Sequence, residues 1–252
     1  MSESGGRRYL SEVTALMQQI LAEETTSVEA AAQLLATQIR ADRLVHVYGP
    51  GGHSNLAAQE VFFRAGGLMH ISAILDEGTL LSSGALRSMA MERTPGYGQV
   101  VIEDWQLGAH DVLILANAYG INSALIDAAL AARDAGVRTV GVSSRVHAEQ
   151  TAPDHPARHR SGANLHDLVE VHVDTKVPIG DAVVQVPGAG EATGAVSTFA
   201  NAFTLNWLML SVVELLAGDE APIPMWRSGN APGGDEANAR FLARFRSRVR
   251  ML

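Results

Sequence analysis

Apolar residues recur at helical spacing near the beginning of the chain. Thr26 followed by Glu29 matches a capping box, which predicts that a second helix begins there and runs to about Arg40. Two helices are therefore expected before the first strand. One face of the first helix collects Val13, Leu16, Met17, Ile20 and Leu21.

Short β-prone runs alternate with helical stretches through the middle of the chain. Ser54, and later Asn122 or Ser123, are expected to begin helices, the later of which ends near Gly136. Because most of the runs are continuously apolar, they predict an α/β three-layer sandwich with a central parallel sheet. Ligands of such sheets bind at the carboxyl ends of the strands. The runs are 44–48, 71–75, 111–115, 137–142 and 169–173.

The rest of the chain predicts one long loop and two helices. Residues 147–164 are rich in Pro, His, Arg and Ala without usable periodicity, which favours a loop that folds over the site. Residues 196–216 are strongly apolar but include Asn201 and Glu214, so they predict a buried or interface helix rather than a membrane span. Residues 237–249 predict a terminal helix.

Length and composition fit a single domain over residues 1–252. The chain is 47% apolar, which suffices for one large core. Helices would occupy about 8–42, the sheet and its covering helices 43–216, and a tail with a helix 217–252. The net charge of −8 argues against nucleic-acid and anionic-membrane partners. The absence of cysteine excludes disulfides and thiolate chemistry, and the polar start shows no signal peptide, so a cytoplasmic location is expected.

Polar loops follow three of the expected strands. In the first loop, Gly51 and Gly52 would let an anion approach backbone N–H groups at a helix start, beside His53 and Ser54. One glycine-rich turn also arises for steric reasons alone. Three polar loops at successive strand ends are a stronger indication of a small-molecule site. The other two loops contribute Asn117, Tyr119, Gly120, Asn122, Ser143 and Ser144.

A dinucleotide site is the obvious rival for the first loop. Gly49 and Gly51 follow a strand, and Asp76 follows another. The third glycine of that fingerprint would fall at Ser54, whose side chain blocks close packing of helix on strand. We therefore expect no dinucleotide cofactor.

Metal binding by the histidines is also disfavoured. Only His155 and His159 are four residues apart, and Pro153 and Pro156 prevent a regular helix around them. We expect no metal, and we expect His159 to reach the pocket from its loop.

A set of short motifs is spread over roughly residues 10–245. The motifs are Gly52-His53-Ser54, 60–68, Glu92-Arg93, Gly96-Tyr97-Gly98, Arg158-His159, Ser161-Gly162, Pro178, Gly180-Asp181-Ala182, Ser197-Thr198, Arg227-Ser228 and Gly233-Gly234-Asp235-Glu236. With these motifs the chain resembles an uncharacterised group of sugar-isomerase (SIS) domain proteins. That group is related to N-acetylmuramic acid 6-phosphate etherase and phosphoheptose isomerase, and it includes N-acetylglucosamine-6-phosphate dehydratase.

The resemblance implies a flavodoxin-like fold with five central parallel strands and no metal or organic cofactor. It also implies a homodimer in which one subunit completes the site of the other. Phosphate would be held by Ser54, by the turn after the 111–115 strand, by Ser143 or Ser144, and by Ser197 and Thr198.

Acid–base chemistry on a sugar needs a group that removes the proton next to a carbonyl. Glu60 lies one or two helical turns from Ser54 and matches a glutamate that the family uses near its ligand. The alternative for Glu60 is a surface ion pair with Arg64. His53 could polarise the carbonyl or bind phosphate.

Two positions depart from the family pattern. A His-Glu-Gly-Ala segment, whose glutamate resembles the base of the etherase, is replaced by Ser82-Ser83-Gly84-Ala85, so Asp76, Glu77 and Glu92 are candidate substitutes. The usual Asn-Ser-Gly of the second loop is replaced by Ala118-Tyr119 before Gly120, which removes a hydroxyl and adds a ring. The changes imply a shifted substrate or lost catalysis.

The sequence thus predicts a homodimeric enzyme, a lyase or isomerase, that dehydrates or isomerises an amino- or N-acetylamino-sugar 6-phosphate. The alternatives are a relative diverted to another, non-phosphorylated small molecule and a non-catalytic sugar-phosphate sensor. The candidate catalytic residues are Glu60, His53 and Glu92. The candidate binding residues are Gly52, Ser54, Ser83, Asn117, Tyr119, Gly120, Asn122, Ser143, Ser144, His159, Ser197 and Thr198.

Overall fold

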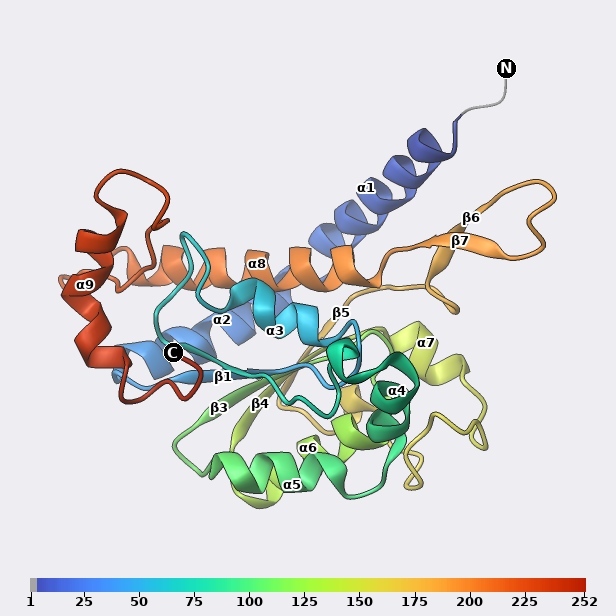
Figure 1. Cartoon of the computed structure of the whole chain (residues 1–252), viewed down its shortest axis with the longest axis horizontal. Coiled ribbons are helices and arrows are strands. Elements are labelled where there is room, and N and C mark those ends of the chain that lie inside the picture. Colours follow the sequence, from blue (N-terminus) through green and yellow to red (C-terminus); the bar gives the residue numbers. More distant parts are fainter. Residues whose placement is uncertain (1–3) are drawn as a thin grey trace.

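The computed structural model describes residues 4–252 as an α/β fold in which two helices precede a central sheet (Figure 1). The N-terminal half contains α1 (Gly5–Glu23), α2 (Thr25–Arg40), β1 (Val45–Tyr48), α3 (Asn55–Val61), β2 (Ile71–Ile74), α4 (Ala85–Arg93), α5 (Tyr97–Trp105), β3 (Val112–Ala116) and α6 (Ser123–Asp134). The C-terminal half contains β4 (Arg138–Ser143), α7 (Arg145–Gln150), β5 (Val171–Asp174), β6 (Ala182–Gln185), β7 (Ala192–Ala195), α8 (Ser197–Leu216) and α9 (Gly234–Phe245).

The central sheet has five parallel strands in the order β2-β1-β3-β4-β5. Val45 of β1 pairs with Ile71 of β2 on one side and with Val112 of β3 on the other, so the three strands run in step. This confirms the expected α/β fold with a five-stranded parallel sheet preceded by two helices.

Helices cover both faces of the sheet, as the continuous apolar strands predict. In β1, Val45 and Val47 pack with α2, α3 and α8, whereas Tyr48 points to the opposite face and packs with α5 and α6. Figure 1 shows these two helical layers above and below the sheet. The helix α8 is long and apolar enough to cross a membrane, but Leu205 and Val212 are fully buried against the sheet layer, which is the expected role of a closing helix.

Several local expectations are wrong. Thr26 does not cap α2, because the helix begins at Thr25 and Glu24 occupies the cap position without a side-chain cap hydrogen bond. The expected loop at 147–164 begins as helix α7, whose cap hydroxyl is Ser144. The helices α4 and α5 and the antiparallel hairpin of β6 and β7 were not expected from the sequence pattern.

Candidate active site at the carboxyl ends of the strands

The strand order places the topological switch point of the sheet, the crevice position of such folds, between β1 and β3. From β1 the chain turns to β2 on one side of the sheet and later returns to β3 on the other, so the loops after β1 and β3 diverge at the carboxyl edge. Such a switch point is where open α/β sheets bind ligands. The polar loops predicted from the sequence, at 49–54 and 117–122, are the two that border it.

Glycines let the first loop approach its neighbours closely. A Cβ at Gly51, where φ is +114°, would lie 2.8 Å from Glu92 Oε1, so the carboxyl group lies directly against this backbone. A Cβ at Gly52 would lie 2.5 Å from Leu81 Cδ2. The positive φ therefore favours glycine at position 51, a side chain at position 52 would have to displace Leu81, and Glu92 borders the loop at the switch point.

Asn117 joins the two loops to Glu92. Its buried Nδ2 donates to Pro50 O at 3.1 Å, to Ser54 Oγ at 3.0 Å and, at 3.3 Å, to Glu92 Oε1. Its Oδ1 accepts from the backbone N–H groups of Tyr119 and Gly120 at 2.9 and 3.0 Å. One amide thus fixes the loop after β1, the loop after β3 and a carboxyl group. Ser54 is at the cap position of α3, but its side chain makes no cap hydrogen bond.

Glu92, near the end of α4, is the carboxyl group with the most useful acid–base behaviour in the crevice. Burial raises its pKa to about 7, and the hydrogen bond from Asn117 and the charge of Arg93 offset only part of that rise. A carboxyl group with this pKa is populated in both protonation states near neutral pH. It can therefore accept and return a proton under ordinary conditions.

Tyr119 and His147 form an aromatic wall beside this carboxyl group. Their rings are stacked, with centroids 3.8 Å apart and planes 20° from parallel. Burial and the negative charges of Asp181 and Glu92 raise the pKa of the Tyr119 phenol, so its hydroxyl stays protonated. Burial lowers the pKa of His147. The sequence gave His147 no role at the site, because its contact with Tyr119 joins α7 to the loop after β3, two segments that are separate in the chain.

The serine hydroxyls after β4 already have partners in the protein. Ser143 Oγ lies 3.0 Å from His172 Nε2, and a Cβ at Gly120 would lie 2.6 Å from the same oxygen. Ser144 Oγ donates to Val177 O at 2.6 Å. These residues fix the loop that carries Gly120.

The N-terminus of α8 is occupied by a carboxylate of the chain itself. Asp181 Oδ1 accepts from the N–H groups of Val196 and Ser197 at 2.9 and 2.7 Å, and Ser197 Oγ donates to Asp181 Oδ2 at 2.7 Å. Thr198 is exposed. Ser197, which the sequence assigned to phosphate, thus holds Asp181 instead. The sequence gave Asp181 no role at the site.

Glu60 lies between α3 and α8 rather than in the contact set of Asn117. Its Oε1 accepts from Asn206 Nδ2 at 3.1 Å and pairs with Arg64 Nη2 at 3.3 Å. This is the ion pair weighed as the alternative from the sequence.

Four further candidates are not hydrogen-bonded to Asn117 or Glu92. His53 is exposed beside Ser54, and Ser83 Oγ donates to Glu77 O at 2.6 Å. His159 is buried against Asp127, at 3.1 Å, and Ser161, at 2.7 Å. Asn122 precedes α6 and donates to Ala157 O at 3.4 Å.

Another candidate of the sequence, Asp76, accepts a hydrogen bond from the Tyr97 hydroxyl at 2.8 Å. Within residues 4–252, no group of three or more His, Cys, Asp or Glu side chains is arranged to hold a metal ion.

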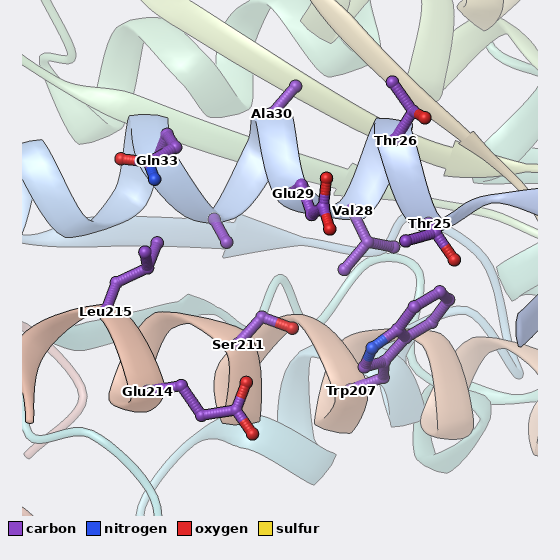
Figure 2. Close-up of a pocket in the computed structure, with 11 residues that line it drawn as sticks. Thr25, Thr26, Val28, Glu29, Ala30, Gln33, Trp207, Ser211, Glu214 and Leu215 are labelled. Carbon is purple, nitrogen blue, oxygen red and sulfur yellow. The ribbon is translucent and has the colours of Figure 1, made fainter.

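A separate groove lies between α2 and α8 (Figure 2). Its volume is about 650 Å³, and Trp207 and Leu215 of α8 face Val28 and Glu29 of α2 across it. None of the site residues named from the sequence lines this groove. Ser54, Asn117 and Glu92 lie together instead at the carboxyl edge of the sheet.

Comparison with known proteins shows the family and the fold. The SIS domain family model matches residues 8–144. A UPF0309 protein of Halalkalibacterium halodurans is 31% identical over 97% of this chain and 96% of its own length. A UPF0309 protein of Brucella canis is 33% identical over 96% of both chains. The solved phosphoheptose isomerase of Neisseria gonorrhoeae shares the fold at a TM-score of 0.55 and 13% identity, covering 84% of this chain and 96% of the other.

Proposed function

Because the chain belongs to the SIS-domain family, in its UPF0309 group, we propose that it is an enzyme that moves protons on a sugar phosphate. The substrate class we infer is an amino- or N-acetylamino-sugar 6-phosphate, which the enzyme dehydrates or isomerises. The solved relative named a phosphoheptose isomerase has the same fold, and it supports a small phosphorylated sugar as ligand.

The observation that carries this proposal is the setting of Glu92. Its carboxyl group touches Gly51, is held by Asn117 at 3.3 Å, and has a pKa raised to about 7 by burial. An acid–base catalyst works best when its pKa is near the operating pH. Glu92 also belongs to the group of acids that the sequence offered in place of the missing family glutamate.

In the proposed reaction, ionised Glu92 accepts the proton from the carbon next to the carbonyl of the ring-open sugar, and an enolate forms. Glu92 then returns that proton to one of two positions. Return to the former carbonyl carbon, with transfer of the hydrogen of the neighbouring O–H or N–H group to the former carbonyl oxygen, gives the isomer. Transfer to the hydroxyl that departs from the carbon β to the carbonyl releases water and gives the unsaturated, dehydrated product. In this proposal His53, which is exposed in the loop after β1, contacts the carbonyl oxygen or the phosphate.

The test is incubation of purified protein with hexosamine and N-acetylhexosamine 6-phosphates and with their dephosphorylated forms, followed by mass spectrometry and isomer-resolving chromatography. Glu92→Gln should lower kcat by about 10²-fold or more, which is the usual contribution of a general acid–base group. Glu60→Gln is the matched control, because Glu60 is another partly buried glutamate but contacts Arg64 and Asn206. It should keep kcat within about threefold.

The outcomes separate the candidate functions. Loss of activity in Glu60→Gln but not in Glu92→Gln would transfer the catalytic role to Glu60. Binding of a sugar phosphate without product from any substrate would replace the enzyme by a sensor. Turnover of only the dephosphorylated forms would indicate a diverted enzyme, in agreement with the occupied N-terminus of α8.

A further inference from the structure

The main chain is held on both sides of the stacked pair of Tyr119 and His147. Tyr119 N donates to Asn117 Oδ1 at 2.9 Å in the loop after β3, and His147 N donates to Ser144 Oγ at 3.2 Å at the start of α7. The His147 ring is held as well, because its Nδ1 lies 3.2 Å from Thr151 Oγ1. The Tyr119 ring is positioned by its stacking on His147.

The pair also borders the crevice. Asn117, which orients Tyr119, contacts Glu92 through its other end. The charges of Asp181 and Glu92 both act on the Tyr119 phenol, so it lies in the field of two carboxylates. Tyr119 is only partly buried, and His147 covers one face of its ring.

A rigid aromatic face next to carboxylates and an amide suits a closed sugar ring. The C–H groups of a pyranose pack on an aromatic surface, while its hydroxyls hydrogen-bond to nearby polar groups. An open-chain sugar has no flat C–H face to offer. We propose that Tyr119, backed by His147, is a specificity-determining residue that stacks on the closed ring of the substrate before the ring opens. This inference rests on the proposed sugar-phosphate function of the same site.

Two unreactive ligands test the inference by isothermal titration calorimetry. The methyl glycoside of N-acetylglucosamine 6-phosphate has a locked ring, and glucitol 6-phosphate is an open chain without a carbonyl. Tyr119→Leu keeps apolar bulk but removes the flat ring, and it should weaken binding of the locked ring by about 3- to 10-fold. It should change binding of glucitol 6-phosphate by less than about twofold, within the range of an ordinary surface change. Tyr119→Phe is the matched control and should keep both affinities.

The results distinguish two kinds of failure. Equal weakening of both ligands in Tyr119→Leu would overturn the stacking role and leave the sugar-phosphate site standing, because both ligands would still bind the wild type. Loss of affinity for the locked ring in Tyr119→Phe would also overturn it, since the hydroxyl rather than the ring would be responsible. If neither ligand binds to the wild type, the proposed function is overturned and the inference with it. If only the open chain binds, the stacking role alone is overturned.

Discussion

At the residue scale, Glu92 links function to stability. Its pKa is raised by burial from the ordinary 4.5 to about 7 in the folded protein. At pH values below 4.5 the carboxyl group is protonated in both states, and folding is not penalised. Between pH 4.5 and 7 the unfolded chain gives up this proton while the folded protein keeps it. Stability therefore falls as the pH rises across this window, and it levels off once the folded protein has ionised the desolvated carboxyl group.

Glu92→Gln should remove that loss. At pH 8 the variant should be more stable than the wild type by about 1–3 kcal/mol, and at pH 4.5 the two should be equal. Urea denaturation at several pH values between 4.5 and 8 measures the difference. Glu12→Gln, at an exposed position of α1, is the control and should follow the wild type. Parallel curves for Glu92→Gln and wild type would mean that the carboxyl group is not desolvated.

The sequence named Glu92 among three candidate catalytic residues but could not single it out, and the reason is physical. Its role depends on contact with Gly51 and Asn117, which come from other loops of the chain. Local patterns report periodicity and turn chemistry, not contacts across the sheet edge. Asp181 and His147 were missed as site residues for the same reason, although the loops that carry Asn117 and Gly51 were found from glycine and amide content alone.

At the scale of elements, the strands were predictable because a strand buried on both faces needs a continuous run of apolar residues. The apolar run at 44–48 matches β1, Val45–Tyr48, all four residues of which are buried. By contrast, α4 gave no signal, because Ser88 is its only fully buried residue, Glu92 is partly buried and Leu86 is 78% exposed. A helix that does not cover the core has no apolar stripe to detect. The helix that positions Glu92 was thus one of the elements that the sequence pattern did not predict.

The N-terminus of α8 gives a second prediction at this scale. Asp181 has a positive φ of 65° and supplies oxygens to three donors at the first turn of the helix. Asp181→Asn tolerates the same backbone conformation but loses the charge and one acceptor. It should lower the free energy of unfolding by about 1–2 kcal/mol, as other losses of helix caps do. Thermal and urea unfolding measure this loss, with the exposed Asp154→Asn as control. An unchanged stability would show that the contact does not hold the hairpin to α8.

At the scale of the whole molecule, two buried histidines oppose Glu92. Burial lowers the pKa of His70 to about 4, against a partly offsetting hydrogen bond that His70 donates to Asp42. Burial also lowers the pKa of His172 to about 4, with Asp174 raising it and His166, Arg145 and Lys176 lowering it. Between pH 6.5 and 4 the unfolded chain binds these protons and the folded protein does not, so stability falls as the pH falls.

As the pH falls from 6.5 to 4, protonation of Glu92 favours the folded protein, whereas protonation of the two histidines favours the unfolded chain. Stability measured across this pH range therefore tests both effects together. In wild type, protonation of Glu92 offsets part of the loss caused by the histidines. In Glu92→Gln that compensation is absent, and stability should fall by about 2–5 kcal/mol between pH 6.5 and 4. Adding His172→Gln should remove roughly half of this fall, because a neutral side chain replaces one of two desolvated imidazoles. Urea denaturation across this pH range measures both variants. An identical fall with and without His172 would show that the buried imidazole is already protonated, and that acid sensitivity arises elsewhere in the fold.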